Sequence, residues 1–390
     1  MKKIFILCLL ASTILFSACK KNDGKKEEEV IPSLRKNLNY ATIDTNTYAK
    51  NFLDMAGDST INRSIGRTYH LMFGGLTAYI KTSVDSTRAL SVTNLKNLYT
   101  NSNSPFTGTY VAANTSSLQI KNTVAASFES NEADKIRADI SLFLENLAAS
   151  SDSVTKIASN DKSGIISTGS KKYLVDGKGI EWGQIVQKSL IGVYQIDHIG
   201  NVLLANLDAD NTNIVAGTKY TQLEQNWDKA YGMLTQKNVY GSAAVEGSTS
   251  GESLLGAYAW EFNPYHPKTN KAVNALHSAF LKGRAAVVNN DKAMVKTQAD
   301  AIRLTFEKAL ASAALGYLGK WKSLSTEAEK AHALAEGIGF IYALRVCKLS
   351  GADVAFSDDI FNDLINTGHW NLTIPQVNSA ESKIKNKFGL

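Results

Sequence analysis

Cysteine and proline are both scarce in this chain. Its 390 residues contain only three cysteines and five prolines, and two of the cysteines, Cys8 and Cys19, lie near the N-terminus. Cys347 is the remaining one, so the body of the protein cannot form an internal disulfide framework. Because Cys347 follows a run of apolar residues, we expect a buried, unreactive thiol rather than a reactive one. Stability must therefore come from a large hydrophobic core.

Signatures of known chemistry are missing as well. The sequence has no Gly-x-Ser-x-Gly, no His-Glu-x-x-His, no phosphate-binding loop and no dinucleotide fingerprint. The glycine pair Gly74-Gly75 predicts a helix cap or a close helix contact. The formal net charge is only +6 and the basic residues are dispersed, whereas nucleic-acid-binding proteins concentrate them on one face. We therefore expect no nucleic-acid partner, and an enzyme is the less favoured class.

The first nineteen residues have the order of a bacterial secretory signal. Lys2 and Lys3 precede an apolar run at 4–16, which ends in Ser17-Ala18-Cys19. A cysteine directly after the small residues marks a lipoprotein signal, so we predict removal of residues 1–18 and acylation of Cys19. The alternative is an uncleaved anchor helix, but the apolar run is shorter than the roughly 20 residues that span a bilayer.

The segment after Cys19 predicts a tether. Residues 20–29 are almost all charged, with both signs present, and such a segment cannot bury apolar surface. We therefore expect residues 19–32 to be a disordered tether. Lys20 stands where an aspartate would favour retention in the inner membrane. We predict a lipid anchor in the outer membrane. The protein is expected on either the periplasmic or the cell-surface face of that membrane.

Helical periodicity dominates the rest of the chain. Four segments repeat apolar residues every three to four positions, at 131–149, 182–207, 298–318 and 326–346. Weaker helical patterns occur at 48–56, 65–81, 221–237, 271–289 and 358–367.

The segment 326–346 has the features of a central helix. It begins with Thr326 and Glu329, the polar positions of a capping box. Its many glycines and alanines would let neighbouring helices approach closely. Extended structure is indicated only at 108–120 and 171–174. The sequence therefore predicts an all-α fold.

Four segments together resemble a family of uncharacterised lipoproteins related to the imelysins. They are EWGQIVQKSLIGVYQI (181–196), QNWDKAYGML (225–234), AFLKGRAAVVNND (279–291) and EKAHALAEGIGFIYALR (329–345). The resemblance implies an imelysin-like domain of two packed helical bundles. We place this domain at 33–390, divided approximately into 33–175 and 176–390. The uncharacterised family has no established activity, whereas imelysins are linked to iron-regulated uptake and a peptidase activity has been claimed for some.

The resemblance also points to a possible site. Imelysins carry a helical Gly-x-His-x-x-Glu signature, and the equivalent residues here are Gly192, Tyr194 and Asp197, with His198 beside them. Tyrosine suits ferric iron or haem better than zinc, because its phenol titrates near 10. The alternative is that these residues form a hydrogen-bond network between bundles. The cofactor is thus unknown, with iron or haem as the candidates.

His332 and Glu336 form the other candidate pair. They are spaced i and i+4 on the central helix, where two side chains can share a metal. The alternative is a buried histidine–glutamate hydrogen bond between bundles. We place the candidate site where the segment 182–207 meets 326–346. Arg284 is expected to form a structural bridge with Asp228 or Asp197.

These observations favour a lipid-anchored ligand-binding or accessory protein in the uptake of iron, haem or another metal or nutrient. Its expected partners are the membrane, through the anchor, and other outer-membrane uptake proteins. A metal-dependent peptidase is the first alternative, and it requires Asp197, His198, His332 and Glu336 to meet around a metal. A structural surface lipoprotein is the second.

Overall fold

The computed structural model describes residues 34–242, 251–262 and 275–390. The predicted signal peptide, Cys19 and the tether lie outside this part of the chain. Within it, nearly every element is helical, and the strands form one two-stranded sheet. The all-α prediction is confirmed. None of the described helices combines the length and the apolar character needed to cross a membrane.

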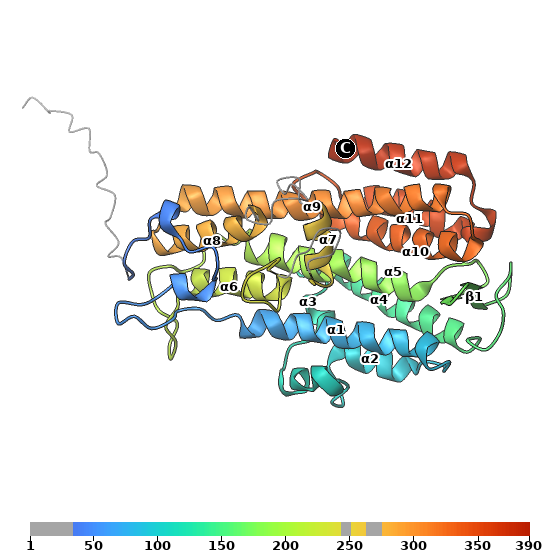
Figure 1. The fold of residues 1–390 in the computed structure, drawn as a ribbon, viewed down its shortest axis with the longest axis horizontal. Helices are drawn as coiled ribbons and strands as arrows, with labels where there is room; N and C mark the ends of the chain where they lie inside the picture. The colour runs from blue at the N-terminus through green and yellow to red at the C-terminus, as the bar shows by residue number, and fades with distance from the viewer. Residues whose placement is uncertain (1–33, 243–250, 263–274) are drawn as a thin grey trace, which may run out of the picture. The chain divides into compact units, whose positions relative to one another are not determined.

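Figure 1 shows how the helices follow one another along the described chain. The α-helices are α1 (Ser64–Asp85), α2 (Val92–Thr100), α3 (Ile120–Thr123), α4 (Ser130–Ser151), α5 (Trp182–Leu190), α6 (Gln222–Leu234), α7 (Leu255–Phe262), α8 (Ala275–Val288), α9 (Lys292–Ser323), α10 (Glu327–Ala343), α11 (Val354–Thr367) and α12 (Ile374–Phe388). Short 3-10 helices are η1 (Tyr40–Thr42), η2 (Ala49–Asn51), η3 (Gly108–Thr115), η5 (Leu344–Val346) and η6 (His369–Asn371), and η4 (Ile191–Leu203) is a π-helix.

Helix α10 lies between α9 and α5, as its small residues predict. A Cβ atom built on Gly339 would lie 2.7 Å from the Cβ atom of Lys188 and 3.1 Å from the carbonyl oxygen of Gln184. The two helices therefore touch through their backbones. Thr326 caps α10 by accepting a hydrogen bond from the backbone N–H of Glu329. The predicted central helix and its N-cap Thr326 are confirmed, whereas the Glu329 carboxylate accepts a hydrogen bond of 2.9 Å from the Thr326 hydroxyl instead of from its backbone N–H.

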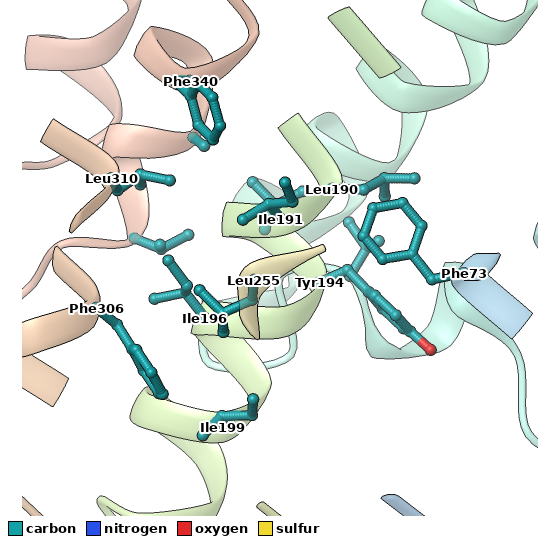
Figure 2. Packing of buried hydrophobic residues seen from close by; sticks show 14 of the residues in the cluster. Phe73, Leu190, Ile191, Tyr194, Ile196, Ile199, Leu255, Phe306, Leu310 and Phe340 are labelled. Atoms are coloured by element: carbon teal, nitrogen blue, oxygen red, sulfur yellow. The ribbon is translucent and has the colours of Figure 1, made fainter. Parts of the chain in front are cut away.

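The segment 182–207 is helical, but its second half winds more widely than an α-helix. It consists of α5 followed by η4, and every residue from Ile191 to Gly200 is buried. π-Helices are rare in proteins, and those that do occur often lie at functional sites. Figure 2 shows Ile191 and Ile196 facing Leu310, whereas Tyr194 points the other way, toward Phe73. Helix η4 is thus enclosed by the core on both sides.

Some local predictions are wrong. Residues 108–120 were expected to be extended, but Gly108–Thr115 forms the 3-10 helix η3. Residues 48–56 contain only the short η2 instead of an α-helix. The extended segment 171–174 is confirmed, because β1 (Gly164–Thr168) pairs antiparallel with β2 (Lys171–Val175).

One hydrophobic cluster contains residues from both sides of position 175, and the division into two bundles stays a prediction.

Candidate ligand site beside His332

The residues of the altered imelysin signature are occupied by internal contacts. Gly192 packs so closely on α10 that a Cβ atom there would lie 2.3 Å from the Cβ atom of Ala343. The Tyr194 hydroxyl donates a hydrogen bond of 2.8 Å to the carbonyl oxygen of Tyr69. Complete burial raises the pKa of Tyr194 well above 10, so the phenol stays protonated. Gly192 and Tyr194 therefore serve the packing of η4.

Asp197 and His198 are buried beside these residues. Asp197 accepts hydrogen bonds from the backbone N–H and the hydroxyl of Ser127 and from the amide of Asn201. Burial nevertheless raises the pKa of Asp197 above its ordinary value. Burial, with the charge of Lys229, lowers the pKa of His198 to about 3. Neither ring nitrogen of His198 has a hydrogen-bond partner among the described residues, so this imidazole is neutral and lies against the Tyr69 ring.

His332 has a different environment, at the edge of the contact between α10 and α5. Its Nδ1 atom lies 2.6 Å from Oε2 of Glu181, the residue that precedes α5, and its Nε2 atom lies 3.5 Å from Oε2 of Glu336. Burial alone would lower the pKa of His332, but the hydrogen bond and charge of Glu181 and the charge of Glu336 raise it above its ordinary value. The structure thus favours an imidazolium held between two carboxylates.

The polar contacts of His332 continue along α5. Lys188 forms a salt bridge of 3.0 Å with Glu336, and its ammonium group lies over the ring of Tyr258 at 5.2 Å from the ring centroid. The predicted pairing of His332 with Glu336 is present, and the histidine–glutamate hydrogen bond between helices is made with Glu181. Sequence spacing could not find Glu181, because it lies far from His332 in the chain.

A pocket of about 430 Å³ opens beside His332. Apolar side chains from α1, α4 and β2 form part of its lining, namely Ile80, Val84, Leu147 and Leu174. Lys81 and Lys172 are exposed at its rim. Tyr173 also lines it and stacks on the His332 ring, with the ring centroids 4.3 Å apart. The pocket therefore combines an apolar lining with charged groups of both signs, because Asp85 and Glu181 also line it.

Two glutamines supply neutral polar atoms to the same pocket. Gln184 and Gln187 both line it, and Gln187 donates from Nε2 to the carbonyl oxygen of Gly183. The Oε1 atom of Gln184 is buried and has no hydrogen-bond partner within the described residues. An unsatisfied buried acceptor costs free energy unless a donor reaches it, so a ligand N–H or O–H would find a partner here.

The two groups of predicted site residues are not brought together. Asp197 lies about four turns beyond Glu181, the partner of His332, which is on the order of 20 Å along a helix. In the described part of the chain, no three His, Cys, Asp or Glu side chains are grouped so that they could hold a metal ion. The helices 182–207 and 326–346 do meet, but of the predicted site residues only His332 lines the pocket, whereas Glu336 contacts His332 without lining it.

Arg284 forms a second buried charge cluster, away from this pocket. Its guanidinium contacts Asp228 at 3.1 Å, Glu224 at 2.9 Å and the Thr60 hydroxyl at 3.1 Å. The predicted bridge between Arg284 and Asp228 is confirmed. The side chains of Arg284, Asp228 and Glu224 are almost fully buried, and their charges pair with one another. The cluster therefore stabilises the fold.

The fold and this pocket define an all-α protein with a partly charged pocket between packed helices. Residues 52–390 match the family described as Domain of unknown function (DUF4856), and the chain belongs to that family. No curated protein and no solved structure matches the chain. The relation to the imelysins stays a prediction from the four sequence segments.

Proposed function

We propose that the protein is a lipid-anchored ligand-binding protein of the outer membrane that assists nutrient uptake. Its ligand is a small organic anion with an apolar body, bound in the pocket beside His332. The observation that carries this proposal is the combination of an apolar lining with His332, Lys81 and Lys172 around one pocket. Ligand sites commonly join an apolar wall to a few convergent polar groups.

The charges of the pocket favour an anion. The two carboxylate neighbours of His332 raise its pKa and so favour the protonated imidazole, and two lysine ammonium groups lie at the rim. Glu181 lines the pocket too, but His332 already neutralises it. Asp85 is an exposed acidic residue at the rim, and its charge opposes that of the two lysines. The lysines can therefore bind a carboxylate while the apolar side chains contact the body of the ligand.

Haem and organic iron chelates are the nutrients that fit this description. Haem and carboxylate-type chelates such as ferric citrate carry carboxylates on an organic framework, so the protein need not supply a set of ligands to the metal. The predicted imelysin relation supports an iron-linked role. The peptidase alternative lacks such support, because its four residues do not converge, and a structural surface lipoprotein would leave the charged pocket without a role.

Binding can be tested with haemin, ferric citrate and zinc ion as probes, using thermal unfolding and absorbance titration. We expect haemin or ferric citrate to stabilise the protein, by roughly 2.7 kcal/mol at a hundredfold excess over the dissociation constant. Zinc should have little effect. The double variant Lys81→Ala/Lys172→Ala should bind several-fold more weakly, since an exposed ion pair contributes about 0.2–1 kcal/mol.

Lys121→Ala is the matched control, because Lys121 is an exposed lysine that does not line the pocket. It should bind like the wild type. The proposal fails if neither haemin nor ferric citrate binds, or if Lys121→Ala weakens binding as much as the double variant does.

A further inference from the structure

A second pocket, of about 590 Å³, lies between α1, α2 and η3. Its lining residues come from the C-terminal half of α1, from α2 and from the loop that leads into η3. None of them lines the pocket beside His332. The two pockets therefore present separate surfaces and can be tested independently.

The lining of this second pocket is rich in neutral hydrogen-bonding groups. Its polar side chains include Thr82, Asn94, Asn97, Asn103, Ser104 and Thr107. Arg88 is the one charged residue among those that line it, and no acidic residue does. Amides and hydroxyls both donate and accept hydrogen bonds, so this surface suits a ligand that does the same.

Aromatic rings complete the pocket, and a glycine pair positions two of them. Phe106 and Tyr110 lie directly on α1: a Cβ atom on Gly74 would be 2.7 Å from a ring carbon of Tyr110, and one on Gly75 would be 2.6 Å from a ring carbon of Phe106. Any larger residue at these two positions would push the rings away. The predicted close contact of this glycine pair thus serves the wall of the pocket.

Tyr79 supplies a third ring, fixed by its own contacts. Its hydroxyl accepts hydrogen bonds from the backbone N–H of Ser91 at 3.1 Å and from the amide of Asn94 at 3.3 Å. The Arg88 guanidinium lies over the ring, 5.6 Å from its centroid, and donates to the Thr82 hydroxyl. Part of the Arg88 charge is therefore engaged within the protein.

The loop between α2 and η3 is held in an uncommon conformation. Asn103 and Ser104, which line the pocket, have φ angles of 60° and 49°, a region that residues other than glycine seldom adopt. Asn101 also has a positive φ, and its amide donates to three carbonyl oxygens, those of Ala113, Ser116 and Leu118. Such a conformation persists only where its surroundings impose it, so the pocket wall is preorganised.

We infer that this second pocket binds a neutral saccharide. A sugar ring offers a C–H face to an aromatic side chain and hydroxyls to amides. The Asn103 amide donates to Oδ1 of Asn97 at 3.3 Å, which leaves the N–H groups of Asn97 to donate to a sugar hydroxyl. The absence of acidic lining residues disfavours a cation, and a single partly engaged arginine disfavours a polyanion.

The test uses maltohexaose, cellohexaose and chitohexaose as probes in calorimetric titrations, each at up to about 10 mM. We expect saturable binding of at least one of them. Tyr110→Ala should weaken it about tenfold through the lost ring contact. Asn97→Ala should weaken it several-fold, and it covers the case in which Tyr110→Ala does not fold.

Lys172→Ala, in the pocket beside His332, should leave saccharide binding unchanged, which separates this inference from the proposed function. Dextran sulfate serves as the anionic comparison. The inference is overturned if no saccharide binds, if neither Tyr110→Ala nor Asn97→Ala weakens binding, or if only dextran sulfate binds, which would make Arg88 an anion site.

Discussion

At the scale of single residues, the surroundings of each histidine decide its charge. His198 and His277 are buried, and their pKa values are lowered to about 3 and about 4. The pKa of His332 is raised instead, since two carboxylates outweigh its burial. Buried neutral histidines destabilise the fold in acid, because the unfolded chain binds protons that the folded chain does not. His332 has the opposite effect.

The sign of the His332 contribution can be tested by its pH dependence. A raised pKa in the folded state means that His332 stabilises fully below about pH 6.5, and that this stabilisation is lost as the pH rises through the folded pKa. We expect the free energy of unfolding of the wild type to fall over that range more than in His332→Gln, measured by urea unfolding. Equal pH profiles of the two proteins would refute an imidazolium at this position.

Arg284 should be the most costly single charge to remove. Arg284→Met leaves Asp228 buried without its cation, while Glu224 keeps only Arg35, and breaking a buried ion pair typically costs about 3–5 kcal/mol. Arg88→Met removes an exposed arginine that contacts the Tyr79 ring and the Thr82 hydroxyl, so it should cost only about 1 kcal/mol or less. Urea unfolding of both variants measures the difference, and similar losses would contradict a stabilising role for the buried cluster.

At the scale of elements, sequence periodicity found the long helices and also the weaker segments that form α1, α6, α8 and α11, but it missed α2 and α12. α9 and α10 repeat apolar residues over several turns, so their positions could be predicted. α2 is short, and the buried face of α12 has few large apolar residues and includes Glu381, so neither gave a clear signal. The wide winding of η4 could not be predicted either, because its apolar repeat resembles that of an α-helix and its polar residues, such as Asp197 and His198, are buried as well.

The sequence could predict only the part of the candidate site that lies on a single helix. His332 and Glu336 share one helix, and their spacing is visible in the sequence. Glu181, Lys172 and Tyr173 reach the same place from other elements. Only the packing of α5, α10 and the β1–β2 hairpin brings them together, so local patterns cannot reveal them.

Close packing of α10 on η4 gives a matched pair of glycine variants. Gly192→Ala would force a Cβ atom to 2.3 Å from that of Ala343, and overpacking of this kind costs about 1–3 kcal/mol or more. Gly316, within α9, has no atom within 4 Å of its added Cβ position. Gly316→Ala should therefore stabilise by about 0.5–1 kcal/mol. A stabilising Gly192→Ala would contradict the close contact.

At the scale of the whole molecule, the proposed lipid anchor at Cys19 would determine where the protein meets a ligand. Replacing Cys19 with serine should release the protein from membranes or leave its signal uncleaved. Cys8→Ser, within the signal itself, is the matched control and should remain membrane-bound. Fractionation with detection of the mature size compares them. A Cys19→Ser variant that is processed and still sediments with membranes would rule out acylation at this residue.

The account depends most on ligand binding beside His332. The direct measurement is the imidazole resonance of His332 by NMR, identified by its loss in His332→Gln, during a titration with the diamagnetic zinc protoporphyrin IX. We predict a saturable shift of the His332 resonance while that of buried His198 stays in place. Binding without any change at His332, or no binding at all, would contradict the assignment of this pocket as the ligand site.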